Sequence, residues 1–221
     1  MTFNHTAYKA FIEKELMIID KKTDVVPFVL KTAQSDFLSN ITGRDCILKA
    51  RQLGFSSLIL AILTSRFLLK DNQRLVVVSH EADATQRLMD RVKFYIKSFE
   101  DKNKTKIALK YNSRSEIVNQ LNNSTFYIGT AESKSFGRGD TITGLHLSEF
   151  AFYSNPEAIL SGVLQALTPD GLCFIESTAN GFNFFKDFYD RSVANETGFK
   201  THFYSPSWEY DTDFYYRSRK N

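Results

Sequence analysis

One stretch of the sequence, residues 49–57, limits the possible folds more than any other part of the chain. It reads KARQLGFSS and lies between an apolar run of strand length and a longer apolar run of helix length. Phosphate-binding loops of the form G-x-x-x-x-G-K-[ST] occur at this kind of junction between a strand and a helix. Aligned on Gly54 and Ser56, this sequence has Phe55 where the lysine belongs and Lys49 where the first glycine belongs.

Lys49 could still serve such a loop from its other end. Positive charge near a γ-phosphate stabilises phosphoryl transfer, and which end of the loop supplies that charge matters less. The flanks favour this interpretation, because residues 45–48 have the pattern of a buried strand and residues 57–69 that of a helix apolar nearly all round. We therefore interpret residues 49–57 as a phosphate-binding loop with a displaced lysine. A chance Gly-Phe-Ser turn before a buried helix is the alternative.

The chain has the size and composition of a globular protein. Its 221 residues are 43% hydrophobic and include 20 Phe, enough for one large domain or for one domain with appendages. The net charge of +3 is too small to indicate a nucleic-acid partner by itself. Cys46 and Cys173 lie far apart and in no metal-ligand pattern, so we expect buried free thiols. The sequence has no recognisable signal peptide or membrane span, so we expect a soluble intracellular protein without membrane association.

Apolar runs of strand length alternate with helical patterns along most of the chain. Continuous apolar strands of this kind favour an α/β fold, in which helices cover both faces of a mainly parallel sheet. We expect helices at residues 6–19, 32–40, 57–69, 82–98, 156–166 and 183–193, strands at residues 45–48, 74–79, 107–111, 124–129, 144–147, 172–176 and 200–204, and a polar turn at residues 101–106.

The run LHLSE at residues 145–149 is the best candidate for the acidic strand that a phosphate-binding loop needs. Such a strand holds Mg²⁺ and polarises the attacking water at the carboxyl edge of the sheet. Its usual Asp-Glu ending is Ser148-Glu149 here, so we expect Glu149 to activate water and Ser148 to contact Mg²⁺ weakly or through water. An ordinary exposed glutamate at a strand end is the alternative. If Glu149 were not the base, Glu176 and Asp140 would be the next carboxylates to test.

Four segments together resemble one protein family. They are residues 48–57 (LKARQLGFSS), 135–140 (SFGRGD), 145–152 (LHLSEFAF) and 177–181 (STANG), in the order found in that family. The combination resembles the ATPase domain of the large terminase subunit of tailed double-stranded DNA bacteriophages, over about residues 27–205. Some members of that family also carry the loop lysine early and Ser-Glu in the acidic strand. The resemblance implies a RecA-like P-loop ATPase of the ASCE type, with a mainly parallel central sheet flanked by helices.

The resemblance also implies roles for individual residues. Glu149 would activate water, Lys49 would stabilise the phosphates, and Arg138 would act as an arginine finger, a group that contributes roughly 10³–10⁵ in rate. Ser56 and Ser148 would hold Mg²⁺, directly or through water. The nucleotide-binding positions would be Gln34, which would recognise adenine, and Lys49, Ala50, Arg51, Gln52, Leu53, Gly54, Phe55, Ser56 and Ser57, and the coupling motif would be Ser177, Thr178 and Ala179.

Several of these roles have structural alternatives that the sequence leaves open. Gln34 could be a polar residue on a helix surface, and Arg138 could be an arginine on a solvated loop. Residues 177–179 could be a capped turn that opens the next helix. The densest basic stretch, residues 102–110, could contact DNA phosphates or could be a solvated turn.

The implied function is ATP-driven translocation of double-stranded DNA into a procapsid. The implied ligands and partners are ATP, Mg²⁺, double-stranded DNA, the portal protein and procapsid, the small terminase subunit, and further copies in a homo-oligomeric ring in the host cytoplasm. We expect an N-terminal helical segment (1–26), the ATPase domain (27–205) and a linker (206–221) toward an absent nuclease domain. The isolated ATPase domain is expected to be a monomer. A generic RecA-like helicase or translocase, and a nucleotide-binding module with lost hydrolysis, are the alternatives.

Overall fold

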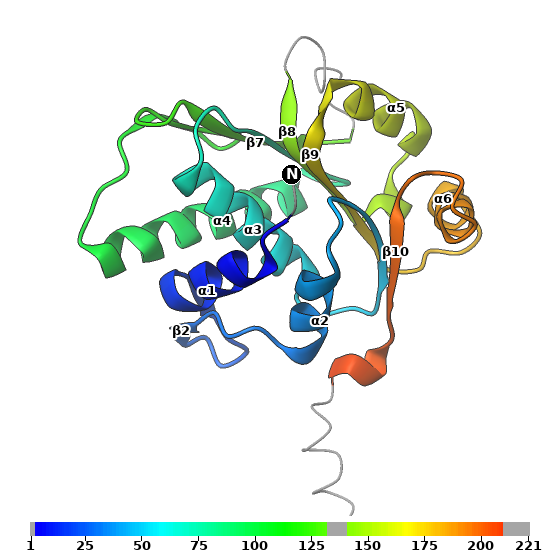
Figure 1. The fold of residues 1–221 in the computed structure, drawn as a ribbon, viewed down its shortest axis with the longest axis horizontal. Coiled ribbons are helices and arrows are strands. Elements are labelled where there is room, and N and C mark those ends of the chain that lie inside the picture. The colour runs from blue at the N-terminus through cyan, green and yellow to red at the C-terminus, as the bar shows by residue number, and fades with distance from the viewer. Residues whose placement is uncertain (1–2, 132–140, 210–221) are drawn as a thin grey trace, which may run out of the picture.

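The computed structural model describes residues 3–131 and 141–209, and its centre is an eight-stranded sheet (Figure 1). In spatial order the strands are β10 (Lys200–Tyr204), β3 (Arg44–Lys49), β9 (Leu167–Ser177), β8 (Ile142–Ser148), β4 (Arg74–Ser79), β7 (Ser124–Thr130), β6 (Glu116–Asn119) and β5 (Leu109–Asn112). The pairings from β10 to β7 are parallel, whereas β7 with β6 and β6 with β5 are antiparallel. The predicted mainly parallel sheet is therefore confirmed.

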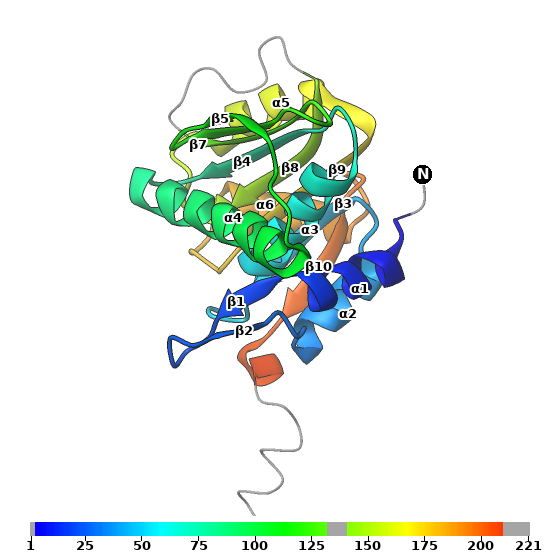
Figure 2. The same ribbon diagram turned by 90° about the vertical axis from the view of Figure 1, so that its left-hand side faces the viewer.

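Helices cover both faces of this sheet (Figure 2). Successive side chains of a strand point to opposite faces, so Ile47 and Cys46 of β3 belong to two different apolar clusters. As expected, Cys46 and Cys173 are buried free thiols, and burial raises the pKa of the Cys173 thiol to about 12. One cluster includes α1 (His5–Glu15), α2 (Thr32–Asn40), α3 (Phe55–Leu69) and α4 (Ala82–Asn103), and the other includes α5 (Pro156–Ala166) and α6 (Phe184–Val193).

The chain crosses the sheet in two opposite directions. From β3 it passes through α3 to β4 and then through α4, β5 and β6 to β7, moving away from β10. From β8 it returns through α5 to β9 and through α6 to β10. Crossovers between parallel strands are right-handed, so opposite directions place the helices on opposite faces. The carboxyl ends of β3, β9, β8 and β4 consequently meet at one edge, where open α/β sheets bind their ligands.

The N-terminal segment differs from the single helix expected at residues 6–19. α1 ends at Glu15, and the chain then forms a hairpin of β1 (Met17–Ile19) and β2 (Val25–Pro27). The carboxylate of Asp20 accepts hydrogen bonds from two backbone N–H groups of the connecting turn. This turn chemistry prevailed over the helical spacing of the apolar residues.

The same segment packs on the core of the sheet. Ile12 and Leu16 are fully buried in the cluster beneath α1–α4. The division of the chain at residues 26 and 205 stays a prediction, and most of the expected linker, residues 210–221, lies outside the described residues. In the part of the chain that the structure describes, no helix is both long and apolar enough to span a bilayer.

Two central elements also differ from expectation. α4 continues to Asn103, so half of the polar turn expected at residues 101–106 is helical. β6 is a strand that the sequence does not predict, because its buried positions are Ile117 and Asn119, and a polar residue at one of them hides the alternating apolar pattern. The other expected helices and strands are confirmed, with bounds that differ by a few residues.

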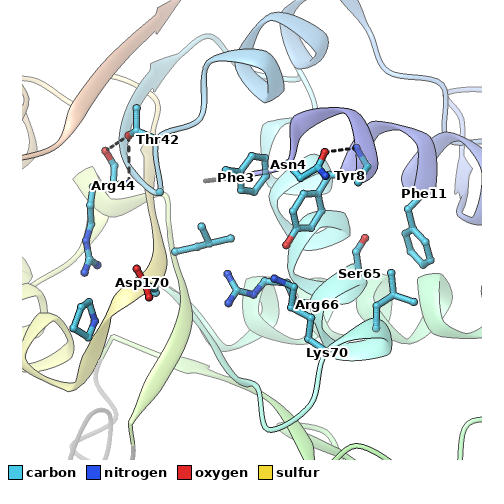
Figure 3. Close-up of a pocket in the computed structure, with 16 residues that line it drawn as sticks. Phe3, Asn4, Tyr8, Phe11, Thr42, Arg44, Ser65, Arg66, Lys70 and Asp170 are labelled. Carbon is cyan, nitrogen blue, oxygen red and sulfur yellow. Dashed lines mark hydrogen bonds between the residues drawn. The ribbon is translucent and has the colours of Figure 1, made fainter. Parts of the chain in front are cut away.

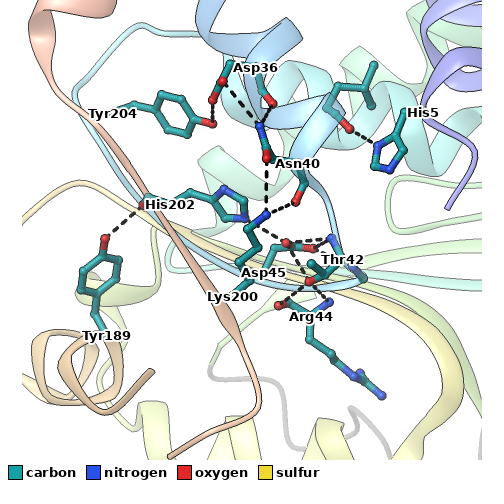
Figure 4. A network of polar contacts seen from close by, with 12 residues as sticks. His5, Asp36, Asn40, Thr42, Arg44, Asp45, Tyr189, Lys200, His202 and Tyr204 are labelled. Atoms are coloured by element: carbon teal, nitrogen blue, oxygen red, sulfur yellow. Dashed lines mark hydrogen bonds and ion pairs between the residues drawn. The ribbon is translucent and has the colours of Figure 1, made fainter. Parts of the chain in front are cut away.

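A buried polar network ties β10 to β3 and α2 (Figure 4). Asp45 of β3 is fully buried, and its carboxylate lies 2.9 Å from His202 Nε2 and accepts hydrogen bonds from two N–H groups of the preceding turn. Further along β10, the Tyr204 hydroxyl donates to Asp36 of α2 at 2.7 Å. A buried carboxylate is costly unless it is partnered. The network therefore fixes the edge strand next to β3, whose last residue is Lys49.

We expect Asp45→Ala to lower the free energy of unfolding by about 2–4 kcal/mol, because the His202 ring, the buried N–H group of Gly43 and the partly buried N–H group of Thr42 lose their acceptor. Urea denaturation followed by circular dichroism measures this change. The control is Asp101→Ala, whose exposed carboxylate pairs with Lys97 on α4 and should contribute less than about 1 kcal/mol. Equal losses in the two variants would contradict a stabilising role for the network.

Candidate active site

The predicted phosphate-binding residues form a turn between β3 and α3. Gly54 precedes α3 with φ +79°, and a Cβ on it would lie 2.7 Å from Gln34 Nε2, so glycine is needed here. Phe55, Ser56 and Ser57 form the first turn of the 15-residue α3. The N–H groups of a first turn have no partner within the helix, and together with the helix dipole they favour a bound anion.

Phe55, at the position of the standard lysine, belongs to the core. It is 1% exposed, and its ring centroid lies 5.4 Å from that of Phe37 and 4.6 Å from that of Tyr204. The side chain therefore anchors the start of α3 against α2 and β10, away from any phosphate. Phe55 could therefore contact a nucleotide only through its backbone N–H group. Its predicted role in nucleotide binding stays a prediction in that form.

The other loop residues differ in what they offer a nucleotide. The Ala50 N–H group already donates to the Tyr204 backbone oxygen at 2.8 Å, which extends the pairing of β3 with β10. Leu53 is 1% exposed and packs in the core, whereas Arg51 and Gln52 are exposed. Contact of these residues with a nucleotide stays a prediction, and Arg51 and Gln52 have the side chains free to make it.

Lys49 ends β3 between two carboxylates. Its Nζ lies 2.8 Å from Glu149 Oε1 and 3.0 Å from Glu176 Oε2, and the residue is only 8% exposed. Burial pushes the pKa of Lys49 down, but the two carboxylates outweigh burial and hold the pKa above its ordinary value of 10.5. The displaced lysine is therefore a charged group at the centre of the cluster, and it reaches this place from the end of the strand.

Glu149 follows β8 and is held by the predicted coupling motif. Its backbone has φ +54°, and its Oε2 accepts hydrogen bonds from the Thr178 N–H group at 3.1 Å and the Thr178 hydroxyl at 3.3 Å. The Ser177 hydroxyl lies 3.5 Å from the same oxygen. With 27% of its side chain exposed and these partners, Glu149 is not an ordinary solvated glutamate. The structure thus brings the predicted base together with Ser177 and Thr178, whereas Ala179 is exposed.

Glu176, on β9, is fully buried at the centre of the same cluster. Its Oε1 accepts hydrogen bonds from the hydroxyls of Ser56 at 2.7 Å and Ser148 at 2.8 Å and lies 3.2 Å from His146 Nε2. Its Oε2 forms the ion pair with Lys49. Burial raises the pKa of Glu176, but Lys49 and His146 outweigh burial and hold the pKa well below its ordinary value of 4.5. The ion pair with Lys49 and the three donors at Oε1 thus favour the ionised form of Glu176.

Sequence reasoning names Glu176 only as a reserve for the base. The run CFIES has the pattern of a buried strand, and a buried strand needs no chemistry to explain it. The available signal is a carboxylate inside an otherwise apolar run, directly before the motif at residues 177–179. Because a carboxylate is almost never buried without a partner, that position indicates a specific contact.

A cavity of about 280 Å³ opens beside this cluster. Two of its residues were not predicted: His80, which directly follows β4, and Phe152, whose ring centroid lies 5.7 Å from that of His80. The position of His80 at the carboxyl end of a parallel strand was a usable signal. The cavity is lined by Lys49, Arg51, Gln52, His80, Glu149, Phe152 and Thr178.

Gln34 lies against the loop and not on an open helix surface. It is 3% exposed, its Oε1 accepts a hydrogen bond from the Lys31 N–H group at 3.0 Å, and its Nε2 donates to the Gly54 oxygen at 2.8 Å. The surface alternative is therefore wrong, and recognition of adenine by Gln34 stays a prediction. The predicted arginine finger, Arg138, and the reserve carboxylate Asp140 lie outside the described residues.

A larger cavity, about 490 Å³, lies at the opposite edge of the sheet (Figure 3). It lies between α1, the end of α3 and the starts of β3 and β9, and Tyr8, Arg44 and Arg66 are among its lining residues. It contains none of the predicted site residues. Ligands of open α/β sheets bind at the carboxyl ends of the strands, so the smaller cavity beside Lys49 and Glu149 is the candidate active site.

Several solved structures share this fold. They are the large terminase of bacteriophage HK97 (TM-score 0.70, 19% identity, 93% of this chain and 43% of that chain), the ATPase domain of the large terminase of Thermus phage P74-26 (0.62, 18%, 85% and 84%), and the large terminase of a thermophilic bacteriophage in complex with ATP-γ-S (0.60, 13%, 87% and 49%). This chain thus spans less than half the length of the first and the third of these proteins. The predicted fold, that of a terminase ATPase domain, is confirmed by these likenesses.

The sequence itself identifies the family. No curated protein sequence matches the chain. Residues 46–216 match the family described as terminase large subunit, T4-like-virus type, N-terminal, and the match covers well over half of the chain. The resemblance found in the sequence is therefore confirmed, and the chain belongs to the T4-like-virus type of the terminase large subunit family.

Proposed function

We propose that this chain is the ATPase motor domain of a DNA-packaging terminase and hydrolyses ATP to drive double-stranded DNA into a procapsid. One observation carries the proposal: Lys49, Glu149 and Glu176 form a charged cluster beside the first turn of α3. The cluster combines a cation, a candidate base and a helix end suited to phosphate at one edge of the sheet. Membership of the terminase family connects this chemistry to DNA packaging.

Lys49 can exchange its carboxylate partners for phosphate. Its ammonium group forms ion pairs with both Glu149 and Glu176 in the structure, from a position close to the loop. Phosphate oxygens at the first turn of α3 would compete for this ammonium group, because they are strong charged acceptors. When Lys49 turns to the phosphates, Glu149 Oε1 loses its ion pair and becomes available to a water molecule.

Glu149 would then act as the general base. Thr178 holds Oε2 of its carboxylate, so the other oxygen has a defined position facing the cavity. A water molecule attacks the γ-phosphorus and passes its proton to Glu149, while the bond between the γ-phosphorus and the bridging oxygen breaks. The products are ADP and inorganic phosphate.

The oxygen atoms around Ser56 fit Mg²⁺. The hydroxyls of Ser56 and Ser148 both lie within hydrogen-bonding distance of the Glu176 carboxylate, and Mg²⁺ prefers oxygen ligands. The described residues contain no group of three or more His, Cys, Asp or Glu that could hold a metal ion. Mg²⁺ in phosphate-transferring enzymes is usually held by one or two carboxylates together with substrate phosphates and waters. When bound, Mg²⁺ would neutralise charge on the phosphate oxygens.

The proposed partners rest on family membership and sequence. They are double-stranded DNA, the portal protein and procapsid, the small terminase subunit, and further copies of this chain in a ring, all in the host cytoplasm. We also propose that Arg138 serves as an arginine finger toward a neighbouring copy, as its Gly-Arg-Gly setting and its distance along the sequence before Glu149 suggest.

We expect Glu149→Gln to leave binding of ATP-γ-S within a few-fold of wild type while ATP hydrolysis falls about 10²–10⁴-fold, because an amide cannot accept the proton from water. Isothermal titration calorimetry measures binding, and phosphate release measures hydrolysis. Glu157→Gln, an exposed glutamate on α5, should retain both. Hydrolysis near the wild-type rate in Glu149→Gln would place the base elsewhere. A wild-type protein that binds ATP without hydrolysing it would support the nucleotide-binding module.

We expect Lys49→Met to weaken binding of ATP-γ-S about 10- to 100-fold, because a charge-assisted contact to phosphate is lost. The same change leaves Glu176 buried without its counter-charge, so the free energy of unfolding should fall by about 3–5 kcal/mol. The double variant Lys49→Met/Glu176→Gln removes both charges and should regain most of the stability but not the affinity. Recovery of affinity in the double variant would show that Lys49 has only a structural role.

A further inference from the structure

β8 ends in Ser148 and is followed by Glu149, so it lacks the aspartate that usually precedes the catalytic glutamate of a P-loop enzyme. In P-loop enzymes the hydroxyl of the loop and an aspartate on a neighbouring strand together hold Mg²⁺. The loop hydroxyl is present here as Ser56, but the residue before Glu149 is Ser148, which carries no charge. A carboxylate on another strand, within reach of Ser56, would supply the charge that the missing aspartate provides.

Glu176 has this position in the sheet. In the parallel pairing of β8 with β9, Ser148 and Glu176 are direct partners, and β9 lies between β8 and β3, the strand that leads into the loop. The Ser56 hydroxyl donates to Glu176 Oε1 at 2.7 Å, and the Ser148 hydroxyl donates to the same oxygen at 2.8 Å. The carboxylate that the loop hydroxyl contacts is therefore on the neighbouring strand.

The balance of charges in the cluster also favours a metal ion beside Glu176. Glu149 and Glu176 bring two negative charges, and Lys49 brings one positive charge that both carboxylates share. Glu176 is fully buried, and a buried carboxylate left without a counter-charge is strongly destabilising. When Lys49 turns to the phosphates of a nucleotide, Glu176 keeps its contacts with His146, Ser56 and Ser148, and a cation beside Ser56 would replace the positive charge that Lys49 withdraws.

We propose that Glu176 is the carboxylate that positions Mg²⁺ in this chain, in place of the aspartate that Ser148 replaces, so that the metal-positioning acid has moved from β8 to β9. The inference rests on the proposed function, because the metal enters with the nucleotide. Ser148 completes the arrangement by donating its hydroxyl to Glu176. A second carboxylate at position 148 would face Glu176 directly and repel it.

The test compares the affinity for ATP-γ-S in Mg²⁺ with that in EDTA, by isothermal titration calorimetry. We expect Glu176→Gln to lose about 10- to 100-fold of the gain that Mg²⁺ gives the wild type, the usual effect of removing a group that orients a metal's ligands. The affinity in EDTA should not fall. Glu15→Gln, a buried glutamate of α1 hydrogen-bonded to Asn103, is the matched control and should keep the whole gain.

The double variant Ser148→Asp/Glu176→Gln exchanges the positions of the carboxylate and the uncharged side chain. It distinguishes a role of Glu176 in positioning the metal from a role in stability alone. It returns the carboxylate to β8, and we expect it to regain much of the Mg²⁺-dependent affinity that Glu176→Gln loses. Electron paramagnetic resonance of Mn²⁺ in place of Mg²⁺ provides a second measure, since bound and free Mn²⁺ differ in their spectra. A folded exchanged variant without Mg²⁺-dependent affinity would contradict the relocation.

Two results would overturn the inference while the proposed function stands. One is a Glu176→Gln protein with the full gain from Mg²⁺. The other is a crystal structure of the wild type with Mg²⁺ and ATP-γ-S in which Glu176 contacts neither the metal nor one of its waters, and this structure decides the matter if both variants fail to fold. A wild-type protein that binds no nucleotide would instead remove the proposed function itself.

Discussion

The ammonium group of Lys49 joins two carboxylates that come from different strands. Lys49 ends β3, Glu149 follows β8, and Glu176 lies near the end of β9 between them. These groups can meet only if three neighbouring strands end at the same level, and parallel pairing provides this. The network around Asp45 and the packing of Phe55 hold β3 and α3 in the required register. The chemistry at the edge thus depends on buried contacts that never touch a ligand.

The two carboxylates of the cluster do not depend on Lys49 alone. Each carboxylate has hydrogen-bond donors besides Lys49: Thr178 for Glu149, and Ser56 with Ser148 for Glu176. One shared cation is a poor match for two anions in a largely buried place, since burial strengthens repulsion as much as attraction. In the proposed function, a nucleotide with its metal would therefore change the partners of groups that are already in place.

The fold was largely predictable from the sequence, because continuous apolar strands and the nearly all-apolar α3 indicate a buried parallel sheet. The loop and Glu149 were indicated by their places at the ends of apolar strands, and residues 177–179 by the resemblance to a known family; the structure brings Lys49, Glu149, Ser177 and Thr178 together, while their roles stay predictions. The hairpin after α1 depends on local turn contacts that helical periodicity does not reveal. Glu176 was undervalued because the sequence cannot show that β9 lies between β3 and β8, which is what brings its side chain to Ser56.

The burial of Phe55 has a consequence for how such loops can change during evolution. A lysine side chain in the place of the Phe55 ring would bring an ammonium group beside the rings of Phe37 and Tyr204, and the nearby carboxylate of Asp36 already accepts a hydrogen bond from the Tyr204 hydroxyl. Loss of Lys49, in turn, would remove the ammonium group that pairs with the buried carboxylate of Glu176. Moving the lysine to the standard position would therefore require the core at the start of α3 to be repacked and the charge of Glu176 to be matched again, and not only two residues of the loop to be exchanged.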